Sequence, residues 1–131
     1  MKAEPIWIEA KEAKFIHELQ IDIFGGKRGI RDENLLESAL ARPKQKWTYA
    51  KPSLFDLAAA YGYGIAKNHP FIDGNKRTAF VILATFLEIN NFILEVPETE
   101  VVLTMEKLPA STLNEDELAT WLEKNSSQIN N

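Results

Sequence analysis

The sequence predicts an all-α domain, a compact bundle of about six helices around one central buried helix. Three observations predict it: apolar residues recur at helical intervals, capping residues stand where these segments begin, and only short stretches have extended character. The chain has 131 residues, of which 45% are hydrophobic, so one domain over 1–131 can build a real core. We expect the tail at 126–131 to fray.

The first two helices are predicted by apolar spacing and by clear stop signals. One covers about 10–24 and ends at Gly25-Gly26. The other begins after an Asp32 cap and ends at Arg42, because Pro43 lacks the N–H that a further helical turn needs.

The third and fourth helices are predicted by their caps. Ser53 and Asp56 have the capping-box spacing, with Asp in place of Glu, so a helix should run from there to about Lys67. Asn75 is a good N-cap for the next helix, 75–90, which is apolar on nearly every side. Such a helix is buried all round and is the expected centre of the bundle.

The rest of the chain predicts an extended stretch at 92–97, followed by helices near 98–108 and 114–125. Gly62 and Gly64 lie inside the third helix, where each costs roughly 1 kcal/mol relative to Ala. We therefore expect a close backbone approach at these glycines, made by the fourth helix.

The connection between the third and fourth predicted helices carries the chemistry. It reads His69-Pro70-Phe71-Ile72-Asp73-Gly74-Asn75-Lys76-Arg77-Thr78-Ala79. Lys76 and Arg77 fall in the first turn of a helix, where free N–H groups and roughly half a positive charge repel cations. A bound oligophosphate would reverse the repulsion, because it accepts bonds from those groups and pairs with both cations, while Gly74 lets the backbone approach.

Asp73 and His69 complete the expected site. A carboxylate beside a phosphate site is repulsive unless a divalent cation lies between them, and Mg²⁺ is commonly held by one or two carboxylates together with phosphate oxygens. An imidazole at His69 can accept a proton from an attacking hydroxyl near neutral pH. The residues therefore predict phosphoryl or nucleotidyl transfer to a hydroxyl.

Each of these residues also has an ordinary structural explanation. A single His at a helix end is more often a C-cap, Asp-Gly-Asn alone is a turn followed by a cap, and Lys76 and Arg77 fit a solvated helix face. Phe71 is expected to plug into the core, and His17, the other histidine, to lie on the surface. The joint occurrence of these residues favours the functional interpretation.

The motif from His69 to Arg77 resembles the signature of the Fic/Doc family. The resemblance extends to Gly25-Gly26, Gly29–Asp32 and Leu35–Pro43, which are similar to the death-on-curing branch, typically toxins of bacterial toxin–antitoxin pairs. What this implies for the site is a general base at His69, a Mg²⁺ ligand at Asp73, and a cradle for the ATP phosphates at Gly74, Asn75, Lys76 and Arg77.

Two departures from the Fic pattern bear on the reaction. Fic adenylyltransferases carry Gly where this chain has Lys76, and a second Arg where it has Phe80. The Doc branch usually has Asn-Lys-Arg, and the resemblance implies an ATP bound in the reversed sense, which presents its γ-phosphate to a threonine of translation elongation factor Tu. A Fic-type adenylyltransferase and an inactive binding module are the alternatives.

Restraint of the activity is expected from a separate chain. Many Fic proteins carry an inhibitory helix with Ser or Thr, three residues, then Glu followed by Gly or Asn, and the nearest string, 111–116, departs at its last position. The resemblance implies a disordered antitoxin tail that folds as a helix on the toxin. It also implies a target-aligning flap within 44–52, at Lys46, Trp47 and Thr48, unless Trp47 simply packs under a loop.

Composition limits the partners and the compartment. A net charge of −4 and a pI of about 5.2 disfavour nucleic acid and anionic membranes, so a protein target is expected. The chain has no cysteine, which excludes disulfides and thiolate chemistry. It shows neither an apolar signal core nor a stretch long enough to span a bilayer, and we therefore expect a cytoplasmic protein.

Overall fold

A computed structural model describes residues 3–129. Its helices and strands are α1 (Ala10–Phe24), α2 (Glu33–Tyr49), α3 (Leu54–Asn68), α4 (Asn75–Ile89), β1 (Phe92–Leu94), α5 (Glu98–Glu106), α6 (Glu115–Lys124) and β2 (Ser126–Gln128). The mostly helical fold predicted from the sequence is confirmed. Within 3–129, no helix is both long and apolar enough to cross a membrane.

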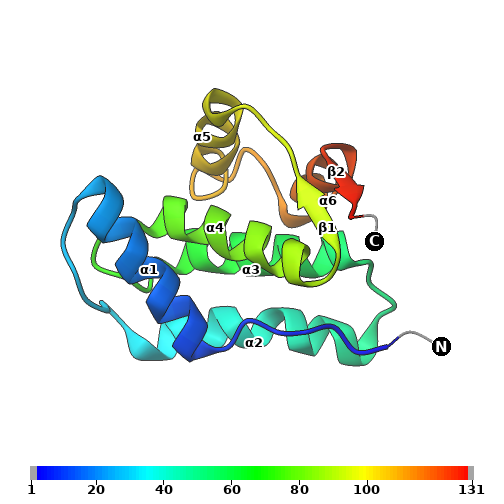
Figure 1. The fold of residues 1–131 in the computed structure, drawn as a ribbon. Coiled ribbons are helices and arrows are strands. Elements are labelled where there is room, and N and C mark those ends of the chain that lie inside the picture. The colour runs from blue at the N-terminus through cyan, green and yellow to red at the C-terminus, as the bar shows by residue number, and fades with distance from the viewer. Residues whose placement is uncertain (1–2, 130–131) are drawn as a thin grey trace.

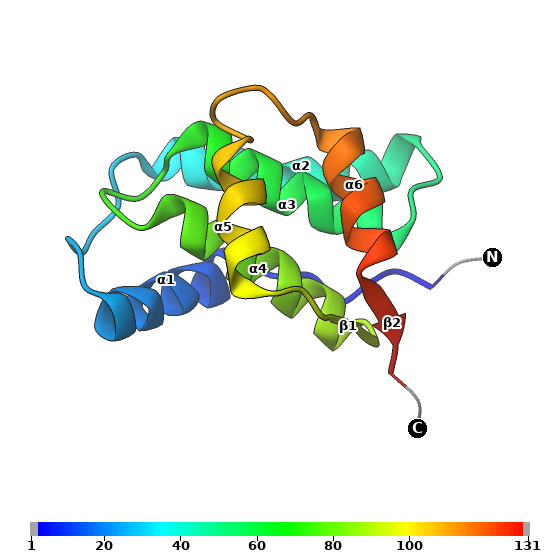
Figure 2. The same cartoon turned by 90° about the horizontal axis from the view of Figure 1, so that it is seen from above.

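Helices α3 and α4 form the middle of the molecule. Figure 1 shows them side by side, with α2 below, α5 and α6 above, and α1 crossing in front next to α4, and Figure 2 shows α5 crossing above them. Helix α3 is the more deeply buried of the pair, and it contacts α2, α4 and α6. Helix α4 is not buried all round, because Lys76 and Arg77 are exposed and Phe80 and Val81 are only half-buried under α5.

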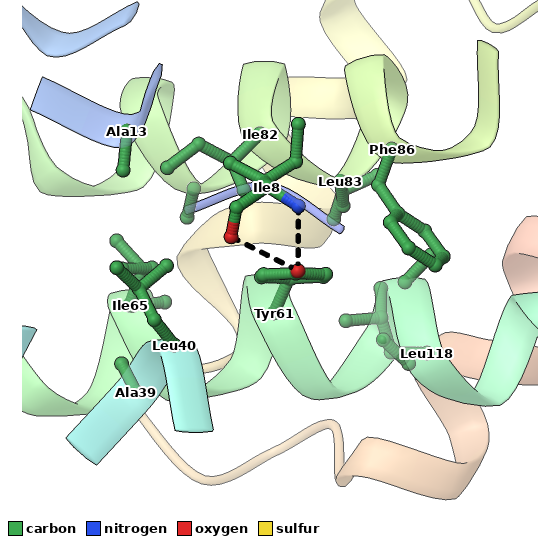
Figure 3. Packing of buried hydrophobic residues seen from close by; sticks show 14 of the residues in the cluster. Ile8, Ala13, Ala39, Leu40, Tyr61, Ile65, Ile82, Leu83, Phe86 and Leu118 are labelled. Atoms are coloured by element: carbon green, nitrogen blue, oxygen red, sulfur yellow. Dashed lines mark hydrogen bonds between the residues drawn. The ribbon is translucent and has the colours of Figure 1, made fainter. Parts of the chain in front are cut away.

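The start of α3 follows the predicted capping box. The Ser53 hydroxyl accepts a hydrogen bond from the Asp56 backbone N–H, and the Asp56 carboxylate accepts one from the Ser53 N–H. Further along α3, the buried Tyr61 hydroxyl accepts from the Ile8 N–H at 2.9 Å and donates to the Ile8 carbonyl at 3.1 Å (Figure 3). Burial raises the pKa of Tyr61, so the neutral phenol ties the N-terminal segment to the core.

The two glycines of α3 mark close helix contacts, as expected. A Cβ on Gly62 would lie 2.4 Å from Leu83 Cδ2, so a glycine at this position allows α4 to pack closely against α3. A Cβ on Gly64 would lie 3.3 Å from Ala39 Cα. The neighbour of Gly64 is therefore α2 and not the expected α4.

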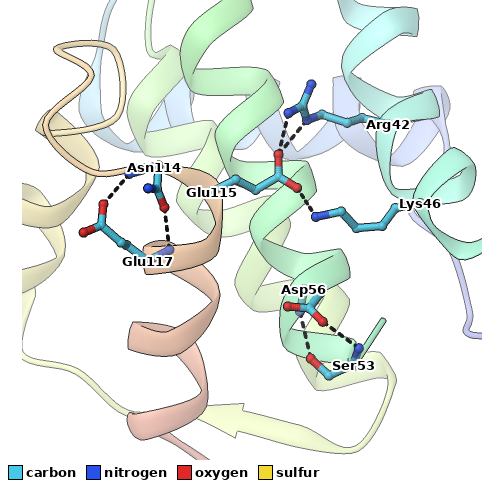
Figure 4. A network of polar contacts seen from close by, with 7 residues as sticks. All are labelled: Arg42, Lys46, Ser53, Asp56, Asn114, Glu115 and Glu117. Atoms are coloured by element: carbon cyan, nitrogen blue, oxygen red, sulfur yellow. Dashed lines mark hydrogen bonds and ion pairs between the residues drawn. The ribbon is translucent and has the colours of Figure 1, made fainter. Parts of the chain in front are cut away.

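Helix α2 does not end at Arg42, and the expected flap at Lys46, Trp47 and Thr48 is wrong. Pro43 lies inside the helix, and the chain stays helical to Tyr49. Packing outweighs the missing Pro43 hydrogen bond. The Trp47 ring lies edge-on to Trp7 with centroids 6.4 Å apart, and Lys46 forms an ion pair with Glu115 of α6 (Figure 4).

The chain does not fray over the whole tail. Strand β2 pairs antiparallel with β1, with Phe92 opposite Gln128 and Leu94 opposite Ser126. The Ile129 N–H then donates to the Asn91 carbonyl at 2.8 Å. Backbone pairing thus orders the chain to 129, and 130–131 lie outside the described residues.

Candidate active site

The predicted motif forms the loop between α3 and α4. His69 ends α3 in the left-handed conformation, with φ 51°, and its N–H donates to the Ile65 carbonyl. The His69 side chain is exposed, whereas Phe71 is 1% exposed and plugs into the core, as expected. The C-cap role of His69 belongs to its backbone, so the imidazole stays available for chemistry.

The segment Gly29–Asp32 lies along this loop and holds it. The N–H groups of Arg31 and Asp32 both donate to the Pro70 carbonyl, and the Ile72 N–H donates to the Gly29 carbonyl. The Arg31 guanidinium donates to two carbonyls at the end of α3, from Nε to His69 at 2.7 Å and from Nη2 to Asn68 at 2.8 Å. Arg31 therefore fixes the backbone that carries the imidazole.

Asn75 is not the N-cap of α4. Gly74 takes that position with φ 74°, and Asn75 is the first helical residue, with a buried side chain. Its Oδ1 accepts from the Phe71 N–H and its Nδ2 donates to the Phe71 carbonyl, both at 2.9 Å. Because the side-chain amide of Asn75 is hydrogen-bonded to the loop, the group of Asn75 that can bind a ligand is its backbone N–H.

The same amide also faces His69. Asn75 Nδ2 lies 3.4 Å from His69 Nδ1. This is long for a hydrogen bond, so the contact orients the ring without fixing which nitrogen carries the proton.

Asp73 is held at three atoms. Its carboxylate accepts hydrogen bonds from the Gly74 N–H at 2.9 Å and from the Lys27 N–H at 3.1 Å. Its carbonyl oxygen lies 2.8 Å from His17 Nε2. Among residues 3–129 no group of three or more His, Cys, Asp or Glu could hold a metal ion.

The cations of the motif lie where the sequence places them. Lys76 and Arg77 are exposed in the first turn of α4, which holds no acidic residue. Neither forms an ion pair with any residue that the structure describes. The Arg77 guanidinium lies over the Phe24 ring, with Cζ 3.6 Å from the centroid. This helix start therefore attracts an anion.

A single cavity of about 700 Å³ brings the predicted residues together. His69, Asp73, Gly74, Asn75, Lys76 and Arg77 all line it. The opposite wall comes from the segment after β1 and from α5, and it is mainly apolar, with Val96, Val101 and Met105, but also carries the carboxylates of Glu98 and Glu106. Lys46, Trp47 and Thr48 are not part of the lining. The cavity thus has a cationic floor with a carboxylate and an imidazole, and an apolar wall.

Sequence reasoning missed His17, which is buried and not on the surface. Its side chain is 2% exposed and stacks on Phe71, with ring centroids 3.9 Å apart and planes 5° apart. The sequence did contain a signal for this burial, because position 17 falls on the buried face of α1. The residues of that face recur at helical intervals: Ala13, Ile16, His17, Gln20 and Ile21.

Comparison with known proteins identifies the family. The model of the Fic/DOC family matches residues 7–87. The chain belongs to the Fic/Doc family. The matched part holds the polar residues that the α3–α4 loop and the start of α4 bring to the cavity, whereas the wall formed by the segment after β1 and by α5, with Glu98 and Glu106, lies beyond it.

Two relatives from this family are similar over different lengths. "Toxin Doc" of Mycolicibacterium smegmatis is 50% identical over 70 residues, which cover 51% of this chain and 53% of that protein. "Protein kinase doc" of Escherichia phage P1 is 31% identical over 93 residues, covering 70% of this chain and 74% of that protein. The chain thus spans about half the length of the first relative.

Proposed function

We propose that this Fic/Doc chain is a toxin kinase that transfers the γ-phosphate of ATP to a hydroxyl of a target protein. The observation that carries the proposal is one cavity lined by an exposed imidazole, the Asp73 carboxylate and two exposed cations at a helix start. The names of the two relatives, a toxin and a protein kinase, support the same proposal.

Each group that lines the cavity has one role in the proposed reaction. The phosphates bind the N–H groups and cations of the α4 start, around Lys76 and Arg77. His69 accepts the proton of the target hydroxyl, the hydroxyl oxygen bonds to the γ-phosphorus, and the bond from that phosphorus to the bridging oxygen of ADP breaks. When Mg²⁺ is bound at Asp73, it neutralises phosphate charge. Water takes the proton from His69 afterwards.

The apolar wall gives the nucleotide a second contact. A nucleobase has flat apolar faces, and a largely apolar pocket with a few convergent polar groups is the usual form of a ligand site. Val101 and Met105 of α5 line this side of the cavity. We place the adenine there, with the phosphates over Gly74 and Lys76.

The target and the restraining partner are proposed with the activity. We take elongation factor Tu as the target, through a threonine, which would block translation, and a separate antitoxin as the inhibitor. In support of a separate inhibitor, Glu115 of the chain's own string at 111–116 forms ion pairs with Arg42 and Lys46 of α2 (Figure 4). None of these three residues lines the cavity.

Labelled ATP tests the reaction. Purified elongation factor Tu is incubated with the chain and Mg²⁺, using ATP labelled at the γ- or the α-phosphate in parallel. We expect label from γ-labelled ATP only, and its loss in His69→Asn. Asn suits this position because it tolerates the left-handed backbone of residue 69 but is no base.

The outcomes separate the alternatives. Label from the α-phosphate alone would mean nucleotidyl transfer. If His69→Asn transferred as much γ-label as the parent chain, the imidazole would have no part in the mechanism. If the intact chain labelled neither this factor nor any protein of a cell extract, the chain would be a binding module without kinase activity. Lys51→Gln, an exposed change outside the cavity lining, is the control.

A further inference from the structure

We propose that His17 is a positioning residue, which aims the Asp73 carboxylate into the cavity from the buried side of α1. The inference rests on the proposed function, since it concerns how that site holds its metal-nucleotide. His17 lies outside the α3–α4 loop and does not line the cavity. It acts only through the backbone of the loop.

The hydrogen bond from His17 has a fixed direction. A carbonyl oxygen only accepts, so the 2.8 Å contact between His17 Nε2 and the Asp73 carbonyl requires a proton on Nε2. The ring cannot turn away, because it is 2% exposed and lies flat on Phe71 with centroids 3.9 Å apart. Phe71 is in turn fixed by the Asn75 amide. The donor is therefore held rigidly below Asp73.

Because a peptide unit is planar, the hydrogen bond from His17 also affects the orientation of the Asp73 carboxylate. The Asp73 carbonyl and the Gly74 N–H belong to one planar peptide unit and point in opposite directions. His17 holds the carbonyl end, and the N–H end donates to Asp73 Oδ1 at 2.9 Å. Without the His17 bond the peptide could rotate, and the N–H would no longer be aimed at the carboxylate.

A second anchor comes from the end of the same helix. The Lys27 N–H, just after the Gly25-Gly26 stop of α1, donates to Asp73 Oδ2 at 3.1 Å. Gly74 itself packs against α1, since a Cβ there would lie 3.3 Å from Ile21 Cδ1. Helix α1 and the residues that follow it therefore hold the carbonyl and both carboxylate oxygens, directly or through the Gly74 peptide.

Two variants separate the hydrogen bond from the packing. His17→Phe keeps a ring on Phe71 and removes the donor, whereas His17→Gln keeps a donor and removes the ring. Groups that orient a metal ligand typically contribute about 10- to 100-fold to metal affinity. We expect the affinity for Mn²⁺ with a non-hydrolysable ATP analogue, measured by electron paramagnetic resonance, to fall about 10-fold in His17→Phe and to be partly restored in His17→Gln. Phe15→Ala, on the exposed face of α1, is the control.

A readout without nucleotide tests the geometry by itself. In the ¹H–¹⁵N spectrum of the free protein, the Gly74 and Lys27 amide signals should shift in His17→Phe and stay in place in Phe15→Ala. Unchanged signals, or Mn²⁺-nucleotide binding equal to that of the parent chain, would overturn the role of His17 and leave the proposed function standing. If the parent chain bound no Mn²⁺-nucleotide, the proposed function would fall, and the role of His17 with it.

Discussion

The Asn75 amide pairs with the backbone of Phe71 through two hydrogen bonds of 2.9 Å, as a neighbouring strand would. The Phe71 N–H and carbonyl are buried, and an unpaired buried polar group costs about 1–3 kcal/mol. The pairing also fixes the amide orientation, since only Oδ1 can accept from the N–H. Nδ2 must then face the imidazole of His69. One side chain thus shapes the loop and orients the proposed base.

Asn75→Asp should weaken both the fold and the site. The carboxylate cannot donate to the Phe71 carbonyl, and it places a negative charge beside Lys76 and Arg77. We expect the free energy of unfolding in urea to fall by about 1–3 kcal/mol and the calorimetric affinity for Mg²⁺-ATP to fall at least about 10-fold.

The other end of α4 supplies a matched control. Asn90 pairs with the backbone of Ile6 in the same way, with both bonds 2.9 Å long. Asn90→Asp should therefore lower stability and leave Mg²⁺-ATP binding unchanged. Equal losses of nucleotide binding in the two variants would mean that Asn75 acts only through global stability.

Arg31→Lys should slow the reaction more than it weakens ATP binding. Lys has no planar fork, so it cannot bond the carbonyls of His69 and Asn68 at once. A small displacement of a reacting group costs up to about 100-fold in rate, and we expect kcat to fall within that range while KM for ATP changes little. Steady-state phosphorylation kinetics measure both constants. Arg28→Lys is the control, because Arg28 pairs with exposed carboxylates, and a parent-like kcat in Arg31→Lys would refute the role.

How far the sequence predicts the molecule depends on whether a signal is local. The Ser53 capping box and the Gly25 stop are local, and the structure confirms both within α3 and α1. Pro43 is also a local signal, but it misleads, because contacts of α2 with Trp7 and Glu115 outweigh one missing hydrogen bond. A propensity is a weak prior that tertiary packing overrides.

The site shows the same division. The linear motif puts its six polar and glycine residues, His69 and Asp73 to Arg77, in one cavity lining. The inward turn of Asn75 and the burial of His17 depend on Phe71, which lies 54 positions after His17 in the chain. A single sequence contains no pairing information over that separation, although the helical spacing of His17 with buried neighbours indicated its face.

Gly26→Ala should displace Asp73. A Cβ at this position would lie 2.9 Å from Asp73 Oδ2, and the residue has φ 119°, which an L side chain rarely adopts. We expect Mn²⁺-nucleotide affinity to fall about 10-fold or more, alongside a strain cost of about 1–3 kcal/mol in unfolding free energy.

The adjacent glycine isolates the contact from the strain. Gly25 also has a positive φ, 84°, but a Cβ there meets nothing within 4 Å. Gly25→Ala should therefore cost stability without changing metal-nucleotide binding. A parent-like Mn²⁺ affinity in Gly26→Ala would show that the Asp73 carboxylate can move without loss.

Phe24→Leu should leave the Arg77 guanidinium less firmly held in its position. The guanidinium stacks on the Phe24 ring with Cζ 3.6 Å from the centroid, and the ring is 56% exposed at the end of α1. Cation–π contacts at exposed sites contribute about 0.5–1 kcal/mol, so calorimetry should show ATP affinity reduced about 2- to 5-fold. A Leu side chain keeps apolar contact but has no ring face to hold the cation.

A double-mutant cycle decides whether Phe24 acts through Arg77. In an Arg77→Gln background the ring has no cation to hold, so Phe24→Leu should then leave ATP affinity unchanged. Equal effects in both backgrounds would mean that Phe24 contacts the nucleotide itself, which is possible in geometry because its side chain also lines the cavity. Strong dependence of the Phe24 effect on Arg77 would instead show that α1 sets the direction of the phosphate-binding cation as well as that of Asp73.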